Sequence, residues 1–126
     1  MKHVRLMYFG VVLLLATALL DAHHSPVLFD TTKQLTIEGK VVEFSWTNPH
    51  SSIQLDVPNA TGGVDRWGIE MGSPTSLVKS GWKSTTVKYG DHIKAVVRPL
   101  KSGEHGGLFV SVTLDDGRTL GGRAVQ

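Results

Sequence analysis

Apolar and polar residues alternate along most of the chain after residue 35, and this period of two is typical of strands with one buried face. The segment 53–57 is the clearest case, because Ile53, Leu55 and Val57 are separated by polar residues. The pattern predicts five strands within the segments 35–46, 53–57, 67–71, 93–97 and 108–114. A short edge segment at 118–120 is expected after the turn sequence Asp-Asp-Gly.

The first of these strands is long and changes phase along its length. Leu35, Ile37 and Val41 share one parity, whereas Val42 and Phe44 share the other. Side chains alternate faces along a strand, so a phase change just after Gly39 indicates a bulge or a sharp bend.

One segment departs from the strand pattern and predicts a short helix over 74–80. Ser73 is a suitable N-cap, Pro74 suits the first helical position, and Gly81 suits the C-terminal stop. Three strands, a helix and two strands follow the element order of the OB-fold, with the helix between strands three and four. We therefore expect a mainly β protein with a small, OB-fold-like five-stranded barrel; another small antiparallel barrel or sandwich is the alternative.

Residues 1–22 have the pattern of a secretory signal peptide, with basic residues followed by an apolar run over 7–20. The run is shorter than the roughly 20 apolar residues of a spanning helix, which disfavours the alternative of a retained anchor. Cleavage after Ala22 agrees best with the length of the segment, and Ala18 is the alternative site. Residues 23–126 would then form a single periplasmic or secreted domain with no stable membrane span.

The charge balance bears on the partners of the protein. The chain has 13 basic and 11 acidic residues, and removal of residues 1–22 leaves 11 and 10. A nearly neutral domain is poorly suited to nonspecific nucleic-acid binding, where neutralised phosphates supply the affinity, so we expect no nucleic-acid partner. The chain has no cysteine, which excludes disulfides, thiolate metal sites and a cysteine nucleophile.

Three histidines are candidate metal ligands. Cleavage after Ala22 would make His23 the first residue, so that its amine and its imidazole could chelate one metal ion. His24 follows directly, and His50 ends an Asn-Pro-His turn between the first two strands. Nitrogen ligands suit cupric copper, with zinc as the second choice. The alternative is that the two terminal histidines form a loose end and His50 is a solvated loop residue.

A metal-free binding module is the competing hypothesis. OB-folds bind ligands on the face of strands two and three and on the adjoining loops, where Trp46, Asn48 and Trp67 are the candidate contacts. An alternative role for Trp67 is to fill the core. The motifs GxSxG and HExxH are absent, so we expect a binding protein rather than an enzyme and assign no catalytic residues.

Several motifs together resemble an uncharacterised family of short exported bacterial proteins that carry a domain of unknown function. The resemblance extends over nearly all of residues 23–126, and its most specific parts are the two histidine motifs. The matching segments are AHHS, LTIEGKVVEFSWTNPHSSIQLDV, RWGIEM, SPTSLVKSGW and VTLDDGRTL. The resemblance implies export, a small β-rich domain and a role for the histidines, but no known reaction.

Overall fold

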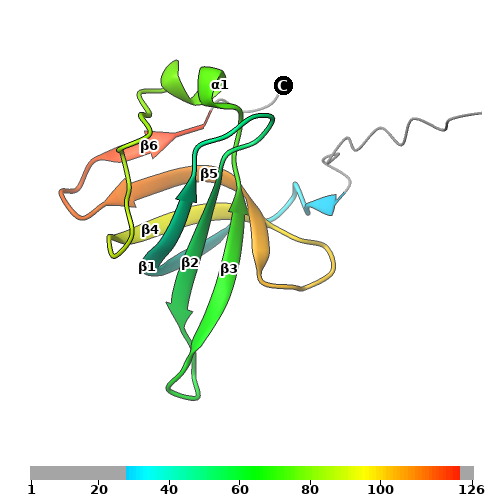
Figure 1. Ribbon diagram of the computed structural model, residues 1–126. Helices are drawn as coiled ribbons and strands as arrows, with labels where there is room; N and C mark the ends of the chain where they lie inside the picture. The colour runs from blue at the N-terminus through cyan, green and yellow to red at the C-terminus, as the bar shows by residue number, and fades with distance from the viewer. Residues whose placement is uncertain (1–27, 123–126) are drawn as a thin grey trace, which may run out of the picture.

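A computed structural model describes residues 28–122 and shows one mainly β barrel with a short helix at one end (Figure 1). The elements are β1 (Leu35–Ser45), β2 (Ser52–Pro58), β3 (Val64–Glu70), α1 (Pro74–Val78), β4 (His92–Pro99), β5 (Gly106–Leu114) and β6 (Thr119–Gly121). The predicted signal peptide, His23 and His24 lie outside the described residues.

The sheet has the strand order β3-β2-β1-β4-β5-β6, and β3 also pairs with β5. The β3–β5 pairing is parallel, whereas the other pairings are antiparallel. The extra pairing closes five strands into a barrel, which confirms the predicted OB-fold-like architecture. Residues 28–122 contain no helix with the length and apolar character needed to cross a membrane.

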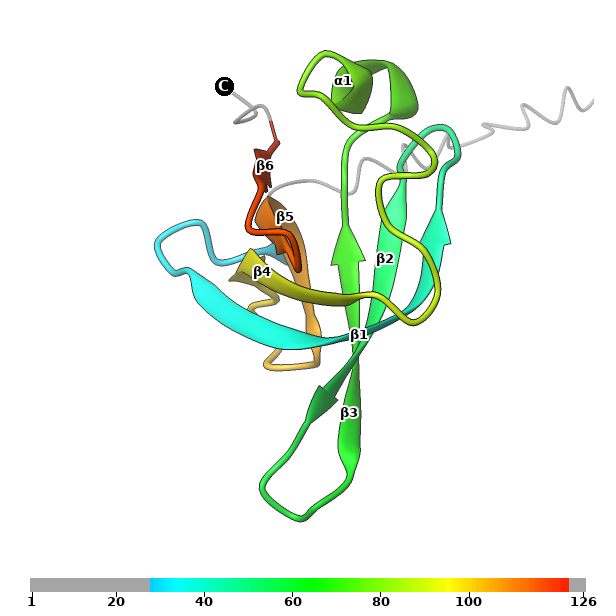
Figure 2. The ribbon, with the colours of Figure 1, turned by 90° about the vertical axis from the view of Figure 1, so that its left-hand side faces the viewer.

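Strand β1 bends because it pairs with β4 through its first half and with β2 through its second half (Figure 2). The predicted irregularity is confirmed as a register shift between Val41 and Glu43. Gly39 lies at the crossing, where an added Cβ atom would stand 2.1 Å from the backbone oxygen of Asp56. A side chain at this position would therefore push β1 away from β2.

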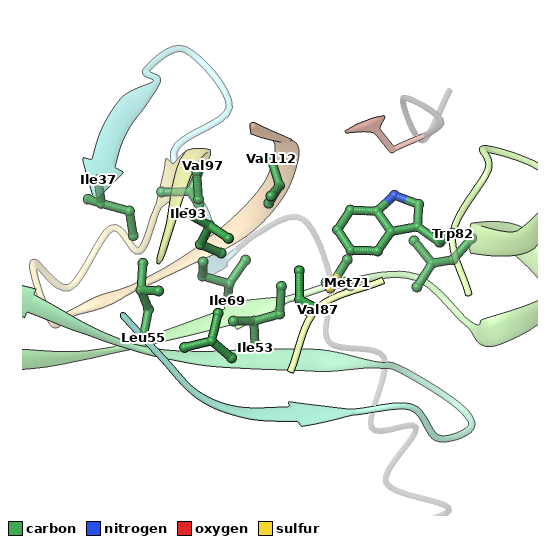
Figure 3. Packing of buried hydrophobic residues seen from close by; sticks show 13 residues of the cluster. Ile37, Ile53, Leu55, Ile69, Met71, Trp82, Val87, Ile93, Val97 and Val112 are labelled. Carbon is green, nitrogen blue, oxygen red and sulfur yellow. The ribbon is translucent and has the colours of Figure 1, made fainter. Parts of the chain in front are cut away.

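Helix α1 and the segment after it close one end of the barrel. The Ser73 hydroxyl accepts a hydrogen bond from the Ser76 backbone N–H, and Pro74 starts the helix, as the sequence predicts. Leu77 of α1 and Trp82 of the segment after it are both buried. Figure 3 shows the Trp82 ring at one end of the core, close to Met71, so Trp82 fills this end of the barrel.

Strand β5 differs from the regular alternation that the sequence suggests. Its pairing with β4 shifts register between Val96 and Val97, so that Ser111 pairs with Val96 but Phe109 pairs with Val97. Phe109 consequently packs against the core and meets Trp82 edge-on, with ring centroids 5.4 Å apart. The bulge accommodates one extra residue, Val110, which sequence periodicity had placed in phase with Val112.

The closure between β3 and β5 depends on glycine. Gly68 pairs with Gly106, and Ile69 pairs with Gly107. A Cβ atom at Gly107 would lie 2.7 Å from the Val97 Cβ and 2.9 Å from the Arg98 backbone oxygen. These neighbours belong to β4, so position 107 must lack a side chain for β5 to pair with β4 on one edge while it pairs with β3 on the other.

We expect Gly107→Ala to lower the free energy of unfolding by about 1–3 kcal/mol, the usual effect of overpacking a dense core. Urea denaturation followed by tryptophan fluorescence measures the loss. Gly63→Ala is the matched control, because its Cβ atom would meet only the Asn59 side chain at 3.6 Å. Equal stability of the two variants would contradict the role assigned to Gly107.

Candidate functional site: a groove beside the His50 loop

The β1–β2 loop, residues 46–51, is fixed at its base by an extension of the β2–β3 ladder. The Ser51 N–H donates to the Gly72 carbonyl at 2.9 Å, and the Met71 N–H donates to the Ser51 carbonyl at 2.9 Å. The Asn48–Pro49 peptide bond is cis. His50 directly precedes Ser51, which is completely buried and held by these two hydrogen bonds, so the His50 backbone has a defined position.

The imidazole of His50 contacts residues at the end of β3. Its Nδ1 atom lies 3.2 Å from the Met71 carbonyl oxygen and 4.0 Å from the Glu70 Oε1 atom. A carbonyl oxygen can only accept a hydrogen bond, so Nδ1 carries the proton in this contact. When the ring is neutral, this contact places the lone pair on Nε2; the side chain is 45% exposed. Metal-binding histidines commonly have this arrangement, with the second ring nitrogen bonded to a carbonyl or carboxylate.

Trp46 and Asn48 lie in the same loop but in different surroundings. Trp46 is partly buried, packs against the core and meets the Phe44 ring edge-on at 5.7 Å. Asn48 is exposed at the turn. Trp46 therefore contributes to closing this end of the barrel, and Asn48 presents its amide to solvent.

Trp67 lies away from this loop, on β3 opposite Leu55, and packs against the core. Its ring stacks on that of His105, with centroids 5.2 Å apart and planes at 25°. His105 Nε2 lies 3.7 Å from the Asp65 Oδ2 atom. The stack attaches the β4–β5 loop to β3, so the core-filling role is the one that the contacts of Trp67 support.

An open groove of about 240 Å³ lies on the outer side of the barrel closure. Its walls come from β2, β3, the start of β5, the segment before β1 and the residue that follows β4. The lining residues are Phe29, Ser52, Gln54, Gly68, Ile69, Glu70, Leu100 and Gly107. Glu70 lines the groove and also lies 4.0 Å from the His50 Nδ1 atom.

Sequence reasoning missed this groove. The alternation of strand two placed Ser52 and Gln54 on the polar face, but it gave no sign of an opposite wall. That wall comes from Phe29, which is only 4% exposed and forms an isolated β-bridge with Leu100. The available signal was an aromatic residue within a polar lead-in segment, but the partner of that residue is about 70 positions away.

Within residues 28–122, no three histidine or acidic side chains are grouped so that they could hold a metal ion. His92 lies between two carboxylates, with Nε2 3.5 Å from Glu38 and Nδ1 3.5 Å from Asp115. His92 and His105 are both about half exposed. Among the predicted ligands, only His50 can be placed by the structure.

A closed five-stranded barrel with a groove across β2 and β3 defines the protein as an OB-fold-like domain. The chain belongs to a family of unknown function (DUF6152), whose model matches residues 11–110. A similar solved structure is that of Rim1, a mitochondrial single-stranded DNA-binding protein from S. cerevisiae. The two share 12% identity and a TM-score of 0.51 over 66% of this chain and 93% of that chain, a likeness of fold alone. No curated protein matches the chain.

The turn next to the groove gives a testable pH effect. The pKa of the Asp30 carboxyl lies below its usual value, because the Thr32 hydroxyl and then the Thr32 backbone N–H donate hydrogen bonds to it. A carboxylate with a depressed folded-state pKa stabilises the fold above its unfolded pKa, and this contribution is lost as the pH falls through the folded value.

We expect Thr32→Val to raise the pKa of Asp30 towards its usual value, because the strongest donor is removed. An NMR titration of side-chain carboxyl carbons measures the change. Thr36→Val, on an exposed position of β1, is the control and should leave the Asp30 titration unchanged. The same Asp30 titration curve in both variants would show that the hydroxyl does not control this carboxyl.

Proposed function

We propose that the protein is a small exported metal-binding protein that binds cupric copper through His23, His24 and His50, with zinc as the second choice of metal. The observation that supports this best is the Met71 carbonyl beneath His50 Nδ1, because it favours the tautomer with a basic Nε2. Cleavage after Ala22 would add an amine and two further imidazoles. Cupric ion prefers such nitrogen ligands in tetragonal geometry.

The length of chain between the described domain and the two histidines is compatible with this site. Phe29 is anchored by its bridge to Leu100, and His24 stands five positions before it, with four residues between them. Five extended residues span roughly 17 Å. The anchor, Glu70 and the groove adjoin one another, and Glu70 adjoins His50.

Export is part of the same proposal. Residues 1–22 provide a basic start and an apolar segment, and the chain has no cysteine that an oxidising compartment would convert to a disulfide. A periplasmic or secreted location would also keep a copper site separate from cytoplasmic thiols, which are strong copper ligands.

We expect His50→Ala to weaken cupric ion binding by the mature chain, residues 23–126, by at least about tenfold, or ~1.4 kcal/mol. Isothermal titration with cupric ion measures the affinity. His92→Ala is the matched control, because His92 is also a half-exposed histidine on the barrel but is not a proposed ligand. Equal affinities of the two variants would exclude His50 from the site.

The position of the amine gives a separate test. Cleavage after Ala18 instead of Ala22 would place four residues in front of His23 and would separate the amine from its imidazole. We expect the chain that starts at Leu19 to bind cupric ion more weakly than the chain that starts at His23. The intact mass and metal content of the exported protein identify the form that exists. A mature chain that starts at Leu19 and carries no metal would contradict the proposal.

A further inference from the structure

One side of the groove is polar and comes from β2 and β3. The pairing of these strands sets Ser52 opposite Glu70, and two residues further on it sets Gln54 opposite Gly68. Alternate residues of a strand share a face, so these positions lie together on the outer face, whereas Ile69 between them is completely buried. The polar side therefore offers a carboxylate, an amide and a hydroxyl, all of which can accept hydrogen bonds.

The opposite side of the groove is apolar and comes from the bridge between Phe29 and Leu100. This bridge is held next to β5, because the Leu100 N–H donates to the Gly106 carbonyl at 3.0 Å. Between the two sides, Gly68 and Gly107 present backbone alone. A ligand lying across the groove would therefore meet hydrogen-bond acceptors at one end and hydrocarbon at the other.

Glu70 gives the groove a negative charge. Of the described residues that line it, Glu70 alone is charged. Its side chain is 24% exposed and lies 4.0 Å from the His50 Nδ1 atom. The lysines and arginines that form ion pairs within residues 28–122 pair with other carboxylates. A cation that entered the groove would thus meet a carboxylate that no lysine or arginine of this part of the chain neutralises.

We propose that the groove binds a small alkylguanidinium cation, with its head on Glu70 and its alkyl stem against Phe29 and Leu100. A guanidinium is planar and donates two parallel hydrogen bonds to one carboxylate, whereas an ammonium is a compact and strongly hydrated charge. The remaining N–H groups can donate to the amide oxygen of Gln54 and to the hydroxyl of Ser52. A guanidinium has no acceptor of its own, which suits a polar side that is able to accept throughout.

The size of the groove sets the length of the stem. A water molecule occupies about 30 Å³ of the liquid, so a groove of about 240 Å³ holds the equivalent of roughly eight non-hydrogen atoms. Butylguanidinium is of this size. Its binding goes beyond the proposed copper site, because it uses only residues 28–122 and needs no metal ion.

An NMR titration of the isotope-labelled mature chain, residues 23–126, with butylguanidinium chloride tests the site. The titration is carried out at constant ionic strength and in the presence of a metal chelator. We expect saturable shifts of the backbone amide signals of Gly68, Ile69 and Gly107. Butylurea is the matched control ligand, because it has nearly the same shape without the charge. We expect it to bind at least about tenfold more weakly, since it lacks the charged hydrogen bonds to the carboxylate.

Variants of the groove locate the ligand. Glu70→Gln should weaken butylguanidinium binding by at least about tenfold. Glu43→Gln is the matched control and should preserve binding, because Glu43 is exposed on the same outer face, opposite Gln54, but does not line the groove.

Gly68→Leu should abolish binding by filling the groove. A Cβ atom at position 68 would stand 3.5 Å from the Gln54 amide nitrogen, an ordinary contact, so we expect this variant to fold. Circular dichroism and tryptophan fluorescence verify that each variant is folded.

Four results would overturn the proposal. They are equal affinities for butylguanidinium and butylurea, unchanged binding in Glu70→Gln, unchanged binding in Gly68→Leu, and shifts confined to amides outside the groove. A failure of copper binding would refute the proposed function but leave this site in place, because the titration contains a chelator.

The side chain of arginine carries the same chemical group, so a capped glycyl-arginyl-glycine peptide identifies the source of the ligand. Tighter binding of this peptide than of butylguanidinium would support the site and assign its ligand to a peptide. Equal or weaker binding would support the site and assign its ligand to a free small molecule.

Discussion

The close approach of β3 and β5 is the constraint on which the rest of the structure depends. The two strands are parallel and far apart in sequence, and they meet through Gly68, Gly106 and Gly107. A Cβ atom at Gly106 would lie 3.4 Å from the Gly68 backbone oxygen on β3, and one at Gly107 would collide with Val97 and the Arg98 backbone on β4. Without this contact the strands would form an open sheet, and the core residues on β3 and β5 would lose their cover.

The same closure creates the groove. Because β5 approaches β3 through glycines, the outer surface at this point has backbone and short side chains where bulky residues would otherwise stand. Phe29 and Leu100 then form a wall from a segment that does not belong to the barrel strands. The groove is thus a consequence of how the barrel closes, and its position next to β2 and β3 is the one that OB-folds use for ligands.

The histidines of the described domain differ in their surroundings, and this difference separates His50 from the others. His92 lies between two carboxylates, and His105 stacks on Trp67 beside Asp65. These contacts explain both residues by surface electrostatics and packing. The Nδ1 atom of His50 contacts the Met71 backbone carbonyl at a barrel end and lies 4.0 Å from the Glu70 carboxylate, and the carbonyl contact orients the ring.

The sequence by itself determined the elements and their order. The period-two pattern, the cap at Ser73 and the phase change after Gly39 are local properties, so they predicted the strands, the helix and the bend of β1. The register shift beside Val97 could not be read in this way, because a bulge depends on which residues of the partner strand face each other.

Only the tertiary structure decided the candidate site. Sequence singled out His50 and the Asn-Pro-His turn, but not the carbonyl of Met71 that orients its ring. Trp67, a candidate ligand contact, stacks on His105, which lies 38 positions further along the chain. The groove joins residues between positions 29 and 107. Such pairings are fixed by barrel closure, a long-range packing effect that no local pattern of residues encodes.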